Sequence, residues 1–242
     1  MEISLAAEQV AHLGPLPITN SMILSWIVSA GLILVTTFSL RNLKSIPSGI
    51  QNFFETIVEA LFNLANSILD DEKATKKYFA LVATIFIFIV TNNWIGLVPG
   101  VGSIGITEHG KFIPLLRGAN ADLNTTLALA IVAVIAIQIF GVAAIGTFKY
   151  AKKFINFNGP INFFIGIIEL ISEFAKMISF SFRLFGNIFA GEVLLTIVAF
   201  LVPLIAPLPF FALEIFVGAV QALVFSMLIL VFIKMAITDV SH

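Results

Sequence analysis

Arg183 is the residue on which any chemistry of this chain depends. It lies inside a hydrophobic stretch that extends from about residue 160 to residue 200. An arginine at the centre of a bilayer costs about 3 kcal/mol on translocon scales and about 10–17 kcal/mol in simulations of an isolated helix. A charge at such a cost faces a protein interior or a water-filled cavity, and it indicates a functional site. Asn187 follows one helical turn later, at i+4, and therefore shares the surface of the arginine.

The helix face that carries Arg183 combines ionisable and small side chains. At about 100° per residue, Lys176 lies about 20° from Arg183 around the helix axis, and Glu169 and Asn187 lie about 40° from it. Three small residues lie about 20° to 60° on the other side of the arginine, namely Ser179, Gly186 and Ala190. Small residues let a neighbouring helix approach closely. The pattern therefore indicates a surface against which a partner helix slides.

Further carboxylates and amides lie close by in the sequence. Glu192 falls on the opposite side of the helix, about 13 Å along it from the arginine. Glu214 and Gln221 stand seven residues apart in the last apolar stretch and share a helix face. Three residues allow two interpretations, a purely structural ion-pair group or part of a polar path: Glu169, Glu173 and Lys176.

The composition predicts a polytopic α-helical membrane protein. Of the 242 residues, 59% are hydrophobic and 11% are charged, whereas about a quarter of the residues in a soluble domain are charged. The mean hydropathy is +1.06, and the alternating segments of a β-barrel do not occur in the sequence. A net charge of −1 gives no basic surplus that would attract nucleic acid. The lack of cysteine excludes disulfides, thiolate catalysis and cysteine metal sites.

We expect a single all-α membrane domain over residues 1–242, with about three upright spans. Glu2 and Glu8 stand where a signal peptide has its basic start, so the first apolar run is expected to be a span rather than a cleaved leader. Residues 70–77 (DDEKATKK) are expected to form a short charged loop. The predicted segments are an outer N-terminal segment (1–21), a span (22–40), an amphipathic interfacial helix (48–69), a span (78–98), an outer loop (99–121), a span (123–148) and a long tilted hairpin (161–201 and 210–238).

The prediction of a long hairpin rests on the length of its first apolar stretch. Residues 161–201 contain no proline, and a helix of this length extends about 60 Å, twice the hydrocarbon thickness. It must either break near Gly186 or Gly191 or lie about 60° from the membrane normal. Three prolines are expected to make the turn into the returning helix: Pro203, Pro207 and Pro209.

Basic residues divide unequally between the two sides of the predicted membrane domain. Only Lys111 and Arg117 fall on one side, and the richer side is expected to be cytoplasmic. The basic residues of the richer side are Arg41, Lys44, Lys73, Lys76, Lys77, Lys149, Lys152 and Lys153. The N-terminus is then outside, and His242 at the C-terminus is inside. Asn92 and Asn93 are interpreted as backbone-capping groups at the end of a span.

Several motifs resemble subunit a of F-type ATP synthases, the stator of the membrane motor. The most specific is Arg183-Leu184-Phe185-Gly186-Asn187, followed by Ala190-Gly191-Glu192. The other matching segments are Thr19-Asn20-Ser21, NWIGLVP at residues 93–99, Asp122-Leu123-Asn124-Thr125-Thr126 and Gln221-Ala222. They follow one another in chain order, so the resemblance covers nearly the full chain.

The resemblance implies ion translocation rather than catalysis. In the family, two aqueous half-channels reach a membrane-embedded carboxylate on each helix of a rotating c-ring. Arg183 would separate the half-channels and pair with the ionised rotor site. The residues that resemble the outer path are Asn187, Glu192, Glu214 and Gln221; some bacterial relatives carry histidine at the position of Glu214. The residues that resemble the inner exit are Glu169 and Ser179, with Glu173 and Lys176 as further candidates.

The same resemblance implies the partners. These are the c-ring, the b subunits of the peripheral stalk and membrane lipid, in the plasma membrane of a bacterium. No nucleic acid, nucleotide, cofactor or metal is expected, because ATP chemistry belongs to other subunits. In the family, the choice between proton and sodium is set mainly by the ring.

Two other classes of membrane protein fit the sequence less well. A secondary transporter or channel usually has inverted repeats or a filter motif, and neither is found. An intramembrane hydrolase needs a nucleophile with its base, or metal ligands. The histidines lie in terminal or loop positions, and no H-E-x-x-H or G-x-S-x-G motif occurs.

Overall fold

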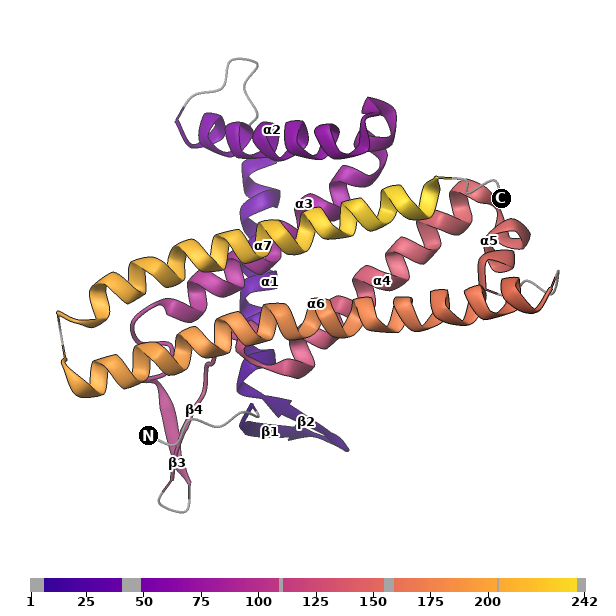
Figure 1. Cartoon of the computed structure of the whole chain (residues 1–242). Coiled ribbons are helices and arrows are strands. Elements are labelled where there is room, and N and C mark those ends of the chain that lie inside the picture. The colour runs from indigo at the N-terminus through magenta and orange to yellow at the C-terminus, as the bar shows by residue number, and fades with distance from the viewer. Residues whose placement is uncertain (1–6, 41–48, 109–110, 155–158, 204, 239–242) are drawn as a thin grey trace.

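The computed structural model describes residues 7–40, 49–108, 111–154, 159–203 and 205–238, and within these ranges the chain is built mainly of α-helices (Figure 1). In chain order the elements are β1 (Gln9–Leu13), β2 (Leu16–Thr19), α1 (Asn20–Leu40), α2 (Ile50–Leu69), α3 (Glu72–Leu97), β3 (Gly105–Glu108), β4 (Lys111–Pro114), a 3-10 turn η1 (Ala119–Ala121), α4 (Leu123–Ile145), α5 (Thr147–Phe154), α6 (Pro160–Leu201) and α7 (Pro207–Ile237).

Five of the described helices are long and apolar enough to cross a membrane, namely α1, α3, α4, α6 and α7. The prediction of a polytopic all-α membrane protein is therefore confirmed. The helix α2 lies across one end of α1 (Figure 1). It buries Leu61, Ala65 and Leu69 and exposes Glu59 and Asn63, as an amphipathic helix does.

The charged segment 70–77 is not a loop, so that expectation was wrong. Asp70 ends α2 in the left-handed conformation, with φ at 57°. The side chain of Asp71 then accepts a hydrogen bond from the backbone N–H of Lys73, which caps the start of α3. Glu72 and Lys76 form an ion pair of 2.6 Å across the first turn. Charged residues with a capping aspartate can extend a membrane helix beyond its apolar part, and this happens here.

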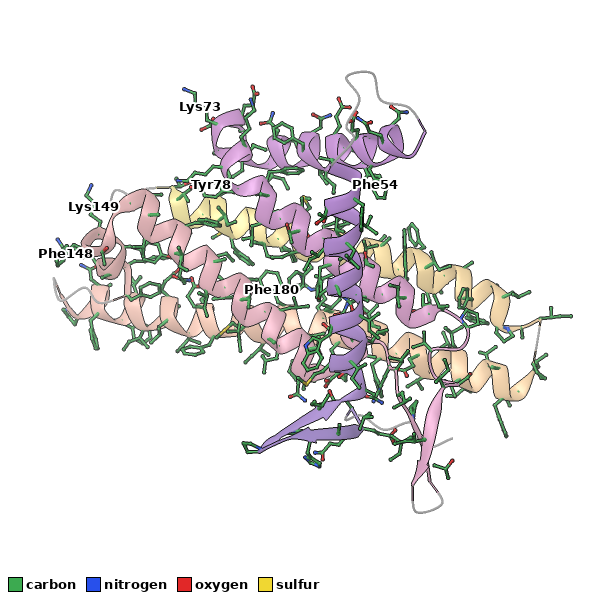
Figure 2. The ribbon with its side chains drawn as sticks, turned by 180° about the vertical axis from the view of Figure 1, so that it is seen from behind. Phe54, Lys73, Tyr78, Phe148, Lys149 and Phe180 are labelled. Atoms are coloured by element: carbon green, nitrogen blue, oxygen red, sulfur yellow. The ribbon has the colours of Figure 1, made fainter. Side chains whose placement is uncertain are left out.

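The third predicted span ends earlier than expected. α4 stops at Ile145 because Gly146 adopts φ 94°, and the separate short helix α5 follows. Lys149, Lys152 and Lys153 therefore belong to a helix of their own rather than to the end of a span. Figure 2 shows Phe148 and Lys149 at the outer edge of the molecule.

The long hairpin is made of two unbroken helices. α6 contains 42 residues and passes through Gly186 and Gly191 without interruption, so of the two alternatives the break is excluded. α7 begins at Pro207 rather than at residue 210, because proline is tolerated in the first turn of a helix. In both views α6 and α7 run across α1 rather than along it (Figures 1 and 2).

The segments predicted as the outer N-terminal segment and the outer loop each contain a β-hairpin. β1 pairs with β2 in segment 1–21, and β3 pairs with β4 in segment 99–121, both antiparallel. The two hairpins lie at the end of α1 opposite to α2 (Figure 1). Side chains at the start of α1 tie this end together: Asn20 Nδ2 donates to the carbonyl of Pro114 at 3.1 Å, and Ser21 Oγ donates to Asp122 Oδ2 at 2.8 Å.

The apolar core lies between the helical hairpin, α6 and α7, and the helices α3 and α4. α3 packs on α7, and α4 packs on both α6 and α7. Phe180, which lies near the middle of the molecule in Figure 2, contacts Phe225 with ring centroids 4.9 Å apart. Leu184 and Ile229 beside them are fully buried. This core holds one side of the hairpin and leaves the other side of α6 uncovered.

Candidate functional site

Arg183 lies on the uncovered side of α6. Its side chain is exposed, and Nη2 donates to Ser179 Oγ at 3.3 Å. Among the described residues, no carboxylate forms an ion pair with Arg183. A guanidinium keeps its charge at any physiological pH. The chain therefore presents a permanent positive charge without an anion of its own.

Small residues surround this charge, as the sequence pattern predicts. Ser179, Gly186 and Ala190 are all exposed on the same face. Apart from its chain neighbours and the adjoining backbone of α6, no atom lies within 4 Å of the position that a Cβ of Gly186 would occupy. Another helix could thus approach the arginine closely along this strip of α6. We call Ser179, Arg183, Gly186 and Ala190 the arginine face.

Glu192 lies on the other side of α6 and meets Arg117 from the segment before η1. Arg117 Nη2 and Glu192 Oε2 are 3.5 Å apart, and the arginine side chain is 9% exposed. Arg117 belongs to the segment that the sequence predicts to be an outer loop. This segment folds back onto the helices and buries the arginine beside a carboxylate.

Glu214 on α7 lies in the space next to Gly191 on α6. Its side chain is buried, and a Cβ at position 191 would overlap with its carboxylate. No described residue donates a hydrogen bond to this carboxylate. Glu192 and Glu214 line the same cavity of about 170 Å³.

Asparagine side chains form the remaining polar wall of this cavity. Asn120 Nδ2 donates to Asn93 Oδ1 at 2.7 Å, and Asn93 Nδ2 donates to the carbonyl of Gly218 at 2.8 Å. Asn93 thus joins α3 to α7 rather than capping its own helix, whereas Asn92 does bond within α3, to the carbonyl of Phe88. Asn92 Oδ1 and Asn120 Oδ1 receive no hydrogen bond from any described residue. A polar cavity with such unpartnered oxygens has room and partners for several water molecules.

An amide pair lies between this cavity and the arginine face. Asn187 Nδ2 donates to Gln221 Oε1 at 2.7 Å, which joins α6 to α7. Gln221 is buried, and its Nε2 donates to no described residue. The four residues of the predicted outer path therefore form two groups between α6 and α7, Glu192 with Glu214 at the cavity and Asn187 with Gln221 in the amide pair. Asn187 is one helical turn from Arg183.

A second polar cluster lies toward the other end of α6. Lys153 Nζ pairs with Glu169 Oε1 at 2.6 Å, and Lys176 Nζ pairs with Glu173 Oε1 at 2.8 Å. Gln138 Nε2 on α4 donates to Glu173 Oε2 at 2.8 Å. Tyr150 on α5 completes the cluster, because its hydroxyl donates to Gln138 Oε1 at 2.6 Å.

Tyr150 stays a neutral phenol in this cluster. Burial, and then the negative charges of Glu173 and Glu169, raise the pKa of Tyr150 to about 12. The hydroxyl is therefore protonated, and able to donate, throughout the physiological pH range.

Sequence reasoning missed six residues of the two clusters: Asn93, Arg117 and Asn120 around the cavity, and Gln138, Tyr150 and Lys153 in the second cluster. Gln138 carried a signal, since it is a polar residue in the middle of an apolar span. Arg117 and Tyr150 carried none, because both lie in segments that look like ordinary connections.

Comparison with known proteins gives one family. The sequence pattern of the ATP synthase A chain matches residues 22–234. The chain is 33% identical to ATP synthase subunit a of Moorella thermoacetica over 93% of its own length and 94% of that protein. It is 36% identical to ATP synthase subunit a of Gloeobacter violaceus, over 94% of this chain and 88% of that protein. It is also 34% identical to the sodium ion specific ATP synthase subunit a of Propionigenium modestum, over 98% of this chain and 80% of that protein.

Proposed function

The chain belongs to the ATP synthase A chain family, whose members are subunit a of the membrane sector, and on this premise we propose that it is a proton-translocating stator in which Arg183 separates two aqueous half-channels. The observation that carries the proposal is the position of Arg183. It lies on an uncovered helix face between two polar clusters of the same chain, about 13 Å along α6 from Glu192 and about 21 Å from Glu169.

The first role of Arg183 is to pair with an ionised rotor carboxylate. A carboxylate that loses its proton inside the membrane is costly unless it is paired. Arg183 has no described anionic partner within its own chain, so its charge is available to a carboxylate on the neighbouring ring. The guanidinium suits this task because it does not deprotonate and presents several donors in a fork.

The second role is to prevent a leak. A proton that crosses about 100 mV releases about 2.3 kcal/mol, and direct passage between the half-channels would waste it. The fixed charge of Arg183 repels protons on the arginine face. Behind that face, Phe180, Leu184 and Phe225 form a buried apolar layer. Protons must then travel with the ring.

The outer half-channel is proposed to pass through the cavity that Glu192 and Glu214 line. Carboxylates in a water-holding cavity can accept and release protons, and Asn187 and Gln221 extend the polar surface toward Arg183. The inner half-channel is proposed to use Glu169 and Ser179, together with Glu173 and Lys176. The ion is proposed to be the proton, and a strict requirement for Na⁺ in ATP-driven pumping would instead favour the ion named for the P. modestum relative.

The proposed partner of the arginine face is the c-ring, with b subunits and lipid covering other surfaces. We place the chain in a bacterial plasma membrane with its N-terminus outside and its C-terminus in the cytoplasm. The distribution of charge supports this orientation, because Lys73 and Lys149 lie on the α2 side of the molecule, away from the two hairpins (Figure 2). The chain itself is proposed to bind no nucleotide and to catalyse no reaction.

Replacement of Arg183 tests the proposal. In the complete ATP synthase in membrane vesicles, Arg183→Ala is expected to abolish ATP synthesis and ATP-driven pumping while it leaves or increases passive proton conduction through the membrane sector. Arg183→Lys is expected to restore little coupled activity, because an ammonium lacks the fork and can deprotonate. ATP synthesis by the alanine variant from an imposed proton gradient would refute the role of Arg183 as separator.

A further inference from the structure

Glu169 and Glu173 lie one helical turn apart on α6, yet their surroundings differ. The Glu173 side chain is 10% exposed and receives Gln138 Nε2 and Lys176 Nζ, each at 2.8 Å. The Glu169 side chain is 31% exposed, and within the described part of the chain its charged partner is Lys153 alone. A proton on either oxygen of Glu173 would compete with a hydrogen bond that the oxygen already accepts, whereas Glu169 is the more exposed of the two carboxylates.

A residue outside α6 sets the direction of the hydrogen bond that Gln138 donates to Glu173. Because the Tyr150 hydroxyl donates to Gln138 Oε1, the amide nitrogen of Gln138 is directed at Glu173. If the amide were reversed, its oxygen would face the carboxylate and repel it. Tyr150 keeps its donor proton because its pKa is raised to about 12.

The short helix α5, which carries Tyr150 and Lys153, packs closely against two other helices. The Tyr150 ring occupies the space that a Cβ at Gly141 would need. The carbonyl of Phe154 lies where a Cβ of Gly166 would be. Two glycines on two different helices thus let α5 approach α4 and α6 closely. This packing determines which part of α6 Lys153 contacts.

We propose that α5 gives the two carboxylates different roles: Glu173 is a fixed anion, and Glu169 is the group that exchanges the proton with water. Tyr150, Gln138 and Lys153 are the positioning residues of this arrangement. The inference rests on the proposed function, since it concerns the inner half-channel, and it assigns the exchange step within that half-channel.

Lys153 keeps a carboxylate nearby throughout the exchange, because Glu173, which also pairs with Lys176, lies within its reach. It lies 2.6 Å from Glu169 and 3.9 Å from Glu173. When the Glu169 carboxylate takes up a proton that the rotor carboxyl has released through water, it becomes a neutral acid. Lys153 then still has Glu173 as its counter-charge. Transfer of the proton to bulk water restores the Glu169 carboxylate and its ion pair.

The groups that face Glu169 set its response to pH. Lys153 from α5 contacts Glu169 directly. The cluster around them also contains Tyr150 from α5, Glu173 and Lys176 from α6, and the neutral amide of Gln138 from α4. From α7, Phe232 lies under the Lys176 ammonium, 4.7 Å from it. Two carboxylates face two ammonium groups, so the cluster is balanced only when Glu169 is ionised.

The test uses the complete ATP synthase in vesicles, with the pH varied on the side of the catalytic sector at a constant driving force. Glu169→Gln is expected to flatten the dependence of ATP synthesis on that pH, and Glu169→Asp to restore it. Glu173→Gln is expected to lower the rate while the profile keeps its shape. Tyr150→Phe should lower the rate about fivefold, the effect of one lost hydrogen bond. Tyr78→Phe, at the other tyrosine, is the matched control and should change neither quantity.

A labelling experiment covers variants that assemble poorly. The chain has no cysteine, so Glu169→Cys and Glu173→Cys each introduce a single thiol into this subunit. A water-soluble maleimide added from the side of the catalytic sector should label position 169 faster than position 173. Tyr150→Phe should increase the labelling of position 173, and Tyr78→Phe should not.

Three outcomes would overturn the inference: a flat profile for Glu173→Gln, an unchanged profile for Glu169→Gln, or equal labelling at the two positions. Each can be distinguished from failure of the proposed function. If Arg183→Ala still makes ATP, the proposed function fails regardless of these profiles. If Arg183→Ala is inactive and Glu169→Gln keeps the wild-type pH profile of ATP synthesis, only the different roles assigned to Glu169 and Glu173 are refuted.

Discussion

The carboxylate of Glu214 on α7 lies in the space that the missing side chain of Gly191 leaves on α6. The two residues are far apart in sequence but form one packing unit, because any side chain at position 191 would meet the carboxylate. This unit forms part of the boundary of the cavity that Glu192 also lines. The position of an ionisable group is thus determined by a residue with no chemistry of its own.

Gly191→Ala should therefore displace Glu214 and slow proton-driven ATP synthesis. Overpacking of this kind costs about 1–3 kcal/mol, so we expect a loss of about tenfold or more in the coupled rate. Adding Glu214→Asp, which shortens the side chain, should recover part of it. Gly31→Ala in α1, where nothing lies within 4 Å of the added atom, is the control. A normal rate in Gly191→Ala would contradict the packing argument.

Glu214→Gln should slow proton-driven ATP synthesis by about tenfold or more, because it removes a proton-binding group from the proposed outer path. The volume of the side chain is nearly unchanged, so assembly should be normal. The measurement is the synthesis rate in membrane vesicles over a pH series. Unchanged rates across the series would remove Glu214 from the path.

Arg117→Gln should destabilise the packing around Glu192, because the carboxylate loses the cation at 3.5 Å. The Glu192 side chain is 41% exposed, so the cost should lie between that of a surface pair and that of a fully buried pair, about 1–3 kcal/mol. Thermal unfolding of the membrane sector should begin at a lower temperature, and the coupled rate should fall. Lys73→Gln, which removes an exposed charge, should change neither.

Gly186→Leu should prevent the ring from approaching the arginine face. The glycine has open space around it within this chain, so the variant should fold, and the clash should arise only in the complex. ATP-driven pumping should be lost while the subunit remains in the membrane. Gly31→Leu on α1 is the control for a bulky residue in a membrane helix. Wild-type pumping by Gly186→Leu would show that no helix passes over this face.

The sequence predicted the parts of the fold that depend on apolar length and on the cost of a buried charge. Arg183 stands out because the charge lies in an apolar run, and α6 is recognisable because its apolar stretch exceeds the bilayer. The start of α3 was missed because charged residues suggest a loop unless the capping role of Asp71 is weighed. The pair of Glu173 with Lys176 follows from their i,i+3 spacing, but the contact of Glu192 with Arg117 and that of Glu173 with Gln138 could not be predicted. Arg117 meets Glu192, and Gln138 and Tyr150 line up beside Glu173, only after distant segments have packed together.

The bond between Ser21 and Asp122 has a consequence for the order in which the molecule is made. The two residues are 101 positions apart, so a ribosome that adds about 5–20 residues per second needs about 5–20 s to produce the second after the first. During that interval α1 stands in the membrane without the acceptor for its serine. Few residues of α1 are buried even in the finished fold. Its final attachment is therefore an event that follows insertion, and it takes place only once the start of α4 has been synthesised.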